Sequence, residues 1–170
     1  MDYETKDQEI LKMGRVQNIF QHPTFQSSLE HNQRTEQTRF FCRHDMTHFL
    51  DTARLAYIFS LERGLALQKD VIYAAGLLHD IGRWVQYQDG TPHDEASASL
   101  AEPILKDSGF SSEECQQILG AIRCHRSVGE ADDLAQVLYD ADKASRSCYL
   151  CPAQSDCNWD DRKKNLKLTW

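Results

Sequence analysis

The chain is most apolar in the segment KDVIYAAGLLHD, residues 69–80. Its apolar residues are nearly continuous rather than confined to one stripe, which is typical of a helix surrounded by other helices. We therefore expect this helix to lie at the centre of the fold. The segment ends on His79 and Asp80, and two polar side chains buried there without partners would cost several kcal/mol. We therefore expect another polar group or an ion to act as the partner of these two side chains.

The remainder of the chain is also predicted to be helical. Apolar residues at three- and four-residue steps predict helices at 7–20 and 46–62, and further helices are predicted at 93–107, 112–125 and 131–145. The segment 24–38 is mostly polar and is predicted to be a surface helix. No strand-like alternation is sustained, so we expect an all-α helical bundle. This bundle is assigned to residues 1–147, and a Cys-rich extension, 148–170, is expected to pack on the same domain.

Length and charge exclude several classes of function. The 170 residues suit one domain of ordinary size. The net charge of −7 disfavours binding to polymeric nucleic acid, because phosphate backbones repel an acidic surface. The start of the chain lacks the basic and apolar regions of a secretory signal, and no apolar run is long enough to span a bilayer. We expect a cytoplasmic protein with no membrane partner.

Three of the predicted helices carry histidine or aspartate side chains, which are residue types that bind metal ions in proteins. His48 lies in the helix 46–62, His79 and Asp80 end the helix 69–80, and Asp142 lies in the helix 131–145. Helical bundles build interior metal sites from such side chains on facing helices. Mixed imidazole and carboxylate ligands suit divalent Fe, Mn, Co, Ni or Zn. The order of these residues therefore indicates a metal site between the helices.

Three stretches of the chain resemble the HD-domain superfamily of metal-dependent phosphohydrolases. They are HDMTHFLDTAR at 44–54, AAGLLHDIGR at 74–83 and YDADK at 139–143. The resemblance covers roughly residues 40–145. It implies an HD-type helical bundle in which His48, His79, Asp80 and Asp142 bind a metal ion.

Two of these ligands have an alternative nearby in the sequence. His44 is the alternative to His48, but His48 has the family's spacing to the small and branched residues that follow it. Asp140 is the alternative to Asp142, but the family's Ala-Asp-basic pattern favours Asp142.

Two further histidines extend the resemblance to the binuclear branches of the superfamily. His93 and His125 match the additional His positions of these branches, which include bacterial hydrolases of dinucleoside tetraphosphates and the cyclic-dinucleotide phosphodiesterases. In this arrangement Asp80 bridges two ions, and His93 and His125 complete the second site. The alternative is a single ion, with these two histidines as substrate contacts in the pocket wall.

The resemblance implies a phosphohydrolase that acts on a small phosphorylated metabolite, with a nucleotide as the expected substrate. A divalent ion lowers the pKa of bound water from near 15.7 toward about 7, which makes hydroxide available. We expect Asp80 to be catalytic through this ion. Arg83 and Lys143 are expected to neutralise charge on the transferring phosphoryl group, with solvated surface positions as the alternative for both.

The C-terminal region holds three cysteines within ten residues, Cys148, Cys151 and Cys157. A four-thiolate site needs one more ligand, and Cys42 is the candidate because the helices of the first metal site would bring it near Cys148. Structural zinc and an iron–sulfur cluster both accept four thiolates. Reduced, unligated thiols are the alternative.

Two other functions fit these residues. Some HD-fold proteins with His-rich binuclear iron sites are oxygenases that cleave carbon–carbon or carbon–phosphorus bonds, and oxygen consumption would identify this branch. A regulatory module that senses metal or redox state through the Cys cluster is the second, and it would show no turnover of any phosphoester. Trp159 and Trp170 are candidates for the contact surface of a homodimer.

Overall fold

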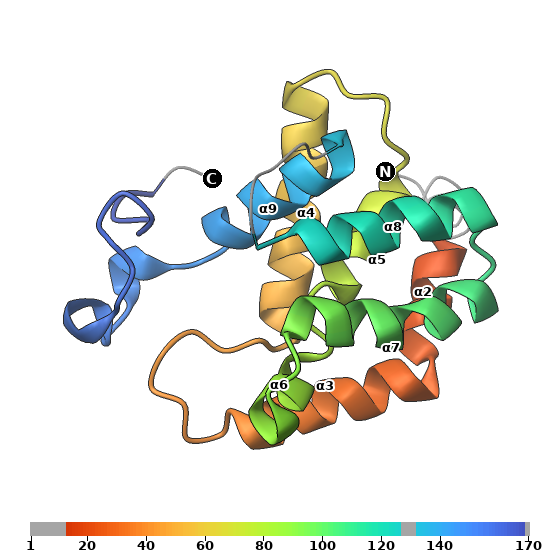
Figure 1. Ribbon diagram of the computed structural model, residues 1–170. Helices are drawn as coiled ribbons and strands as arrows, with labels where there is room; N and C mark the ends of the chain where they lie inside the picture. The colour runs from red at the N-terminus through yellow and green to blue at the C-terminus, as the bar shows by residue number, and fades with distance from the viewer. Residues whose placement is uncertain (1–12, 127–131, 169–170) are drawn as a thin grey trace, which may run out of the picture.

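The computed structural model describes residues 13–126 and 132–168 (Figure 1). Within these ranges the chain forms α-helices and, after them, two short 3-10 helices, with no strand. The all-α prediction is thereby confirmed. The elements in chain order are α2 (Gly14–Gln21), α3 (Pro23–Thr35), α4 (Met46–Glu62), α5 (Lys69–Leu78), α6 (Arg83–Asp89), α7 (His93–Asp107), α8 (Ser112–Cys124), α9 (Asp133–Ala144), η1 (Cys148–Leu150) and η2 (Gln154–Asp156).

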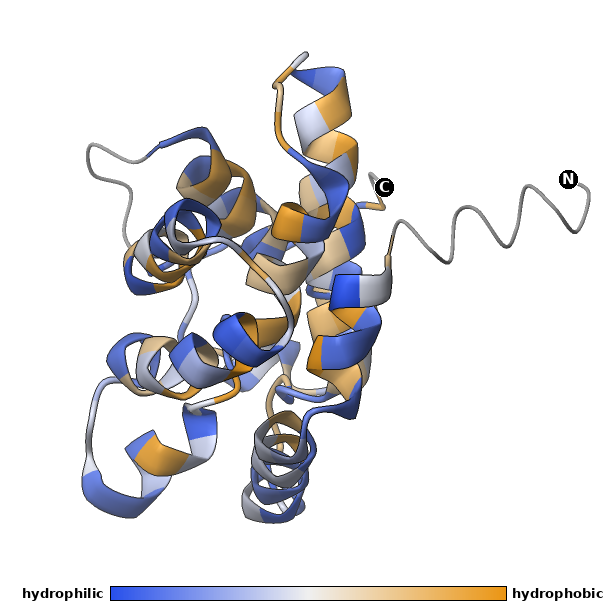
Figure 2. Ribbon diagram, turned by 90° about the vertical axis from the view of Figure 1, so that its right-hand side faces the viewer, coloured by the Kyte–Doolittle hydropathy of each residue, from blue (hydrophilic) through white to orange (hydrophobic). Residues whose placement is uncertain are grey.

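The helix α5 is the centre of the bundle, as its composition predicts. It packs against α4, α8, α9, α7 and α2, and seven of its ten residues are buried. The surrounding helices pair with one another, α4 with α9 and α8 with both α7 and α9. Figure 2 shows that these helices carry both hydrophobic and hydrophilic residues, as expected for helices with one buried side.

The helices α4 and α7 have the predicted bounds, whereas α5 ends two residues earlier than predicted. After Leu78 the chain turns, and the backbone N–H of Arg83 donates to the carbonyl of Asp80 at 3.1 Å. The predicted helix 7–20 begins outside the described residues, as does the predicted helix 131–145. Within the described part α2 and α9 follow these predictions closely.

The structure adds two features to these predictions. The helix α3 is not only a surface helix, because it buries Phe25, Leu29 and the polar side chain of Asn32. The helix α6 was not expected at all. It is seven residues long and buries no side chain, so it leaves no apolar period in the sequence. Gly90, with φ of 85°, ends it in the left-handed conformation that glycine adopts readily.

Gly76 sets how closely α4 and α5 approach. A Cβ atom at this position would lie 2.6 Å from the Cα and 2.8 Å from the backbone nitrogen of Ala53. Neither atom belongs to a flexible side chain, so a substitution at Gly76 would have to separate the two helices. Both helices lead to the polar centre described below, and Gly76 therefore controls its geometry as well as the packing.

We predict that Gly76→Ala destabilises the protein by about 1–3 kcal/mol, because the added methyl group overpacks the contact between α4 and α5. Gly120→Ala is the matched control, since Gly120 also lies inside a helix but has nothing within 4 Å of its Cβ position. That change should be neutral or stabilise by up to about 1 kcal/mol. Urea unfolding of the two variants measures the difference, and equal stability would contradict this role of Gly76.

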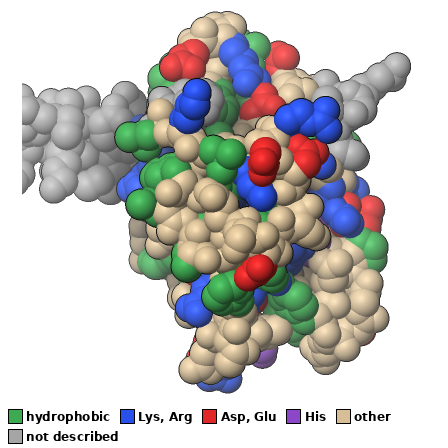
Figure 3. All heavy atoms as spheres, turned by 90° about the vertical axis from the view of Figure 1, so that its left-hand side faces the viewer, with side chains coloured by type: hydrophobic (Ala, Val, Ile, Leu, Met, Phe, Trp, Pro, Cys, Tyr) green, Lys and Arg blue, Asp and Glu red, His purple; other side chains and the backbone are tan. Residues whose placement is uncertain are grey.

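The C-terminal region lies on one side of the bundle, beside the connection between α3 and α4 (Figure 1). The side-chain amide of Asn165 holds it there by donating to the backbone carbonyls of Lys143, Ala144 and Arg146 at 2.8–3.1 Å. Figure 3 looks onto this side and shows basic, acidic and hydrophobic side chains intermixed. Among the described helices, none has the length and apolar character that crossing a membrane requires.

Candidate metal centre

Four polar side chains from three parts of the bundle meet in its interior. The ligand atoms of His48, His79, Asp80 and Asp142 all lie within 4.8 Å of one another, and all four residues are buried. Nε2 of His48 is 3.3 Å from Oδ1 of Asp142, and Nε2 of His79 is 3.3 Å from Oδ2 of Asp80. The structure thus brings together the four residues that the sequence predicts as ligands.

A second group shares one of these residues. Asp80, His93 and His125 also place their ligand atoms within 4.8 Å of one another, and all three are buried. Nε2 of His93 and Nε2 of His125 lie 3.3 Å and 3.6 Å from Oδ1 of Asp80. The two carboxylate oxygens of Asp80 therefore face two different sets of imidazoles. This is the arrangement that a carboxylate bridging two ions requires.

Backbone carbonyls orient two of the imidazole rings. Nδ1 of His79 lies 2.7 Å from the carbonyl oxygen of Gly76, and Nδ1 of His125 lies 2.5 Å from that of Ile122. Because a carbonyl only accepts hydrogen bonds, both Nδ1 atoms carry the proton in the neutral ring. The electron pair of each Nε2 is then directed at the centre, as metal-bound histidines require.

The other two histidines of the centre are oriented by side chains. Nδ1 of His48 lies 3.0 Å from the hydroxyl oxygen of Ser145. Nδ1 of His93 lies between two side chains, 2.8 Å from Oε1 of Gln86 and 2.6 Å from Nη1 of Arg83, a nitrogen that only donates. Ser145 and Gln86 are positioning residues that the sequence did not indicate, and Gln86 lies on the unexpected helix α6.

The carboxylate of Asp80 fits a bound cation. Its Oδ1 atom is buried and accepts no hydrogen bond from the described residues, which is costly for a charged oxygen unless a cation satisfies it. Burial opposes ionisation of Asp80 and Asp142, but the surrounding histidines outweigh burial and hold the pKa of both carboxyls well below the usual range. Burial also opposes protonation of His79, yet Asp80 and Asp142 raise its pKa to about 9. The centre therefore attracts positive charge, and its residues are able to hold a divalent metal ion.

Asn32 fixes the turn that carries Asp80. Its side-chain amide donates to the backbone carbonyl of Asp80 at 2.9 Å, and its Oδ1 accepts from the backbone N–H of Trp84 at 2.8 Å. This bridge explains why a polar residue of α3 is fully buried. An isolated Asn in a polar helix gives no sequence signal for such a role.

The alternative residues from the sequence lie outside both groups. Nδ1 of His44 is bound to Glu36 at 2.5 Å, and Nε2 of His44 is 3.7 Å from Asp80. Burial lowers the pKa of His44 to about 4, although Asp80 and Glu36 oppose this effect. Asp140 pairs instead with Arg63 at 2.7 Å. His44 thus borders the centre, whereas the Asp140 carboxylate is engaged elsewhere.

Cationic side chains surround the centre. Lys143 forms an ion pair with Asp142, and Nη1 of Arg83 lies 2.6 Å from Nδ1 of His93. Arg146, which the sequence did not indicate, is buried and places Nη2 at 3.0 Å from His48 and 3.3 Å from Asp142. Arg83 and Lys143 therefore lie beside residues of the two groups.

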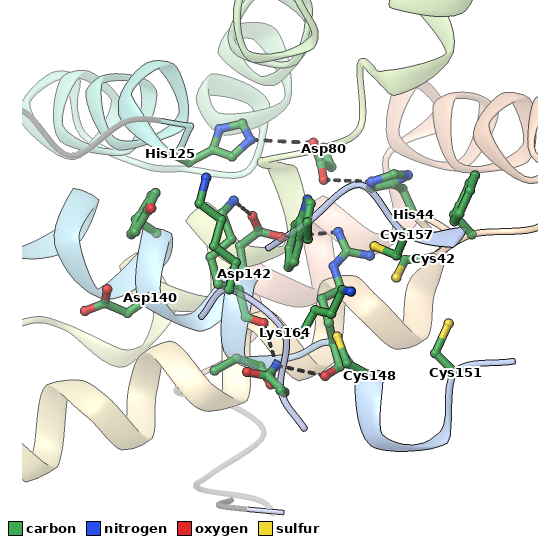
Figure 4. A pocket seen from close by; sticks show the side chains of 18 of the residues that line it. Cys42, His44, Asp80, His125, Asp140, Asp142, Cys148, Cys151, Cys157 and Lys164 are labelled. Carbon is green, nitrogen blue, oxygen red and sulfur yellow. Dashed lines mark hydrogen bonds and ion pairs between the residues drawn. The ribbon is translucent and has the colours of Figure 1, made fainter. Parts of the chain in front are cut away.

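The centre lies in a cavity of about 1170 Å³ that the C-terminal region helps to form (Figure 4). The four cysteines of the predicted thiolate site, Cys42, Cys148, Cys151 and Cys157, line the same cavity. Burial raises the pKa of the Cys42 thiol, Arg146 opposes this, and Cys148 and Cys151 raise it further. Trp159 is partly buried and lines the cavity, and Trp170 lies outside the described residues.

The model of the HD domain family matches residues 45–147, so the chain belongs to this family. A protein of Clostridium beijerinckii with an uncharacterized function is 39% identical over 156 residues, which cover 92% of this chain and 99% of that protein. Ribonuclease Y 1 of Pediococcus pentosaceus is 33% identical over 98 residues, 56% of this chain but 17% of the ribonuclease.

A solved structure shares the fold. The crystal structure of a predicted HD superfamily hydrolase from an uncultured Thermotogales bacterium superposes with a TM-score of 0.61. The match covers 83% of this chain and 79% of that one, at 23% sequence identity. At this identity the likeness concerns the fold alone.

We predict that Asp142→Asn lowers the affinity for divalent metal by more than about tenfold. Loss of a residue that only hydrogen-bonds to a metal ligand already lowers metal affinity or activity by about 10–100-fold, and Asp142 is itself a proposed ligand. Asp140→Asn is the matched control, since Asp140 is in the same helix but pairs with Arg63. Elemental analysis after dialysis against a weak chelator measures the difference. Equal metal retention by the two variants would contradict the assignment of Asp142 as a ligand.

Proposed function

We propose that this protein is a metal-dependent phosphohydrolase that acts on a small phosphorylated metabolite, with a nucleotide as the expected substrate. The observation that carries this proposal is the pair of ligand groups that share Asp80 at a cavity lined by cations. Membership of the HD domain family supports a metal-dependent hydrolase in general terms. The choice of a phosphorylated substrate rests on the cations.

The ligands proposed for the first ion are His48, His79, Asp80 and Asp142, and those proposed for the second are Asp80, His93 and His125. When bound, divalent ions lower the pKa of water toward about 7 and polarise a phosphoryl oxygen. Because the residues of the centre are buried, they would hold such ions in the interior of the protein. Electrostatic interactions are stronger there than in bulk solvent.

Positively charged side chains are proposed to stabilise the negative charge of the substrate. Arg83 and Lys143 lie beside ligands of the two groups and are placed to bind the oxygens of a phosphoryl group as charge shifts between them. Lys143 pairs with Asp142, and with Asp142 engaged as a metal ligand its ammonium group would be free to bind substrate. Both side chains are only partly buried, so they reach the cavity from its wall.

The cavity favours a compact anion. Its lining includes several basic residues from the C-terminal region, Arg162, Lys163 and Lys164. Phe41, Tyr139 and Trp159 also line it and offer flat apolar surface on which a nucleobase can stack. The volume of about 1170 Å³ is ample for a nucleotide, while the net charge of −7 for the whole chain disfavours a polymer.

To test this proposal, the protein is purified without chelator, its metals are measured, and nucleoside mono-, di- and polyphosphates are offered with Mn²⁺, Co²⁺ or Fe²⁺. We expect phosphate release that a chelator abolishes. Cleavage of RNA without turnover of nucleotides, or oxygen consumption without phosphate release, would contradict the proposed reaction.

In the same assay Arg83→Gln should lower kcat/KM by about 100-fold, because one positioned cation is lost from the transition state. Arg54→Gln is the control, since Arg54 is exposed, pairs with Asp51 and lies outside the cavity. Metal content is measured for both variants and turnover is compared at full metal loading, because Arg83 also contacts the proposed ligand His93.

A further inference from the structure

Four cysteines from two distant parts of the chain line one wall of the cavity. Cys42 lies between α3 and α4, whereas Cys148, Cys151 and Cys157 lie after α9. None of the four is in a disulfide, and Cys148 is buried while the other three are partly buried. In Figure 4 their sulfur atoms border the same space, next to the His/Asp centre.

The three C-terminal cysteines are held by two similar turns. Cys151 directly follows η1 and donates its backbone N–H to the carbonyl of Cys148 at 3.1 Å. Cys157 directly follows η2 and donates to the carbonyl of Gln154 at 3.4 Å. The side chain of Gln154 then donates to the carbonyl of Cys148 at 2.9 Å, which ties the two turns together. The backbone thus presents these cysteines as one unit.

Arg146 joins this unit to the segment that carries Cys42. Its Nη1 donates to the backbone carbonyl of Arg43, the residue after Cys42, at 3.2 Å. Arg39 donates from Nε to the carbonyl of Cys42 at 2.8 Å. Two guanidinium groups therefore anchor the segment that carries Cys42 beside the C-terminal cysteines.

The separation of the sulfur atoms distinguishes between the two kinds of thiolate site. Around a tetrahedral zinc ion with Zn–S of about 2.3 Å, the sulfurs are about 3.8 Å apart. Within the described residues no three of these sulfurs lie within 4.8 Å of one another, although His and Asp ligands elsewhere do. A cubane cluster binds each cysteine through a different iron atom, so it accepts thiolate sulfurs that lie farther apart than around a single zinc ion.

From this geometry we infer that Cys42, Cys148, Cys151 and Cys157 bind a [4Fe–4S] cluster, separate from the ions of the His/Asp centre. The cluster fastens the C-terminal region to the connection before α4 and so holds one wall of the cavity in place. The inference does not depend on which reaction the His/Asp centre catalyses.

To test it, the full chain is purified without oxygen, or reconstituted with ferrous iron and sulfide. Iron and acid-labile sulfide are then measured together with the visible absorption of the chromophore. We expect about four sulfides per chain, the number that defines this cluster. Acid-labile sulfide is the key readout, because the His/Asp centre can hold iron but contains no sulfide. Cys151→Ser should lose most of the sulfide and the visible absorption.

Cys124→Ser is the matched control and should keep both, since Cys124 is an exposed cysteine of α8 outside this set. Asp142→Asn should also keep the sulfide while it loses metal from the His/Asp centre, which separates the two sites even if Cys151→Ser does not fold. Zinc in place of iron and sulfide in the wild-type protein would overturn the inference. Full sulfide content in a folded Cys151→Ser protein would overturn it as well.

Discussion

The buried carboxylate of Asp80 is the constraint on which the rest of the molecule depends. It is almost fully enclosed, the surrounding histidines hold its pKa well below the usual range, and its two oxygens face different imidazoles. A charge in such a place is costly unless opposite charge accompanies it. The surrounding helices are arranged so that four histidines and a second carboxylate converge on it, and a divalent cation held by these residues would complete the balance of charge.

The same backbone features that pack the bundle also build this centre. Gly76 lets α4 and α5 approach closely, and its carbonyl orients the ring of His79. Asn32 then holds the turn after α5 in the shape that directs Asp80 inward. Packing and function therefore cannot be separated at these positions, because a shift of the helices would also move ligands of the centre.

The sequence predicted those parts of the structure that have a regular pattern. The apolar residues of α5 indicated its central position, and the bounds of α4 and α7 followed from their sequences. The six residues predicted as ligands come together in the structure, and the motifs around them made them recognisable in the sequence. The residues that position them have none.

The polar side chains of Asn32, Ser145 and Arg146 contact residues 48 to 103 positions away in the chain, and Gln86 contacts His93, seven positions away on the next helix. No local period marks such contacts, so only the folded arrangement identifies them. The same reason explains why α6 was missed, since this short helix buries no side chain. Arg146 is the most informative of these residues, because it contacts both the His/Asp centre and the segment beside Cys42.

The most direct measurement is anomalous X-ray scattering from crystals of the protein loaded with Mn²⁺ or Fe²⁺, recorded at the absorption edge of that metal. A bridging role for Asp80 predicts two peaks beside this residue, one bounded by His48, His79, Asp80 and Asp142 and the other by Asp80, His93 and His125. The absence of any peak beside Asp80 in fully loaded crystals would contradict the central claim.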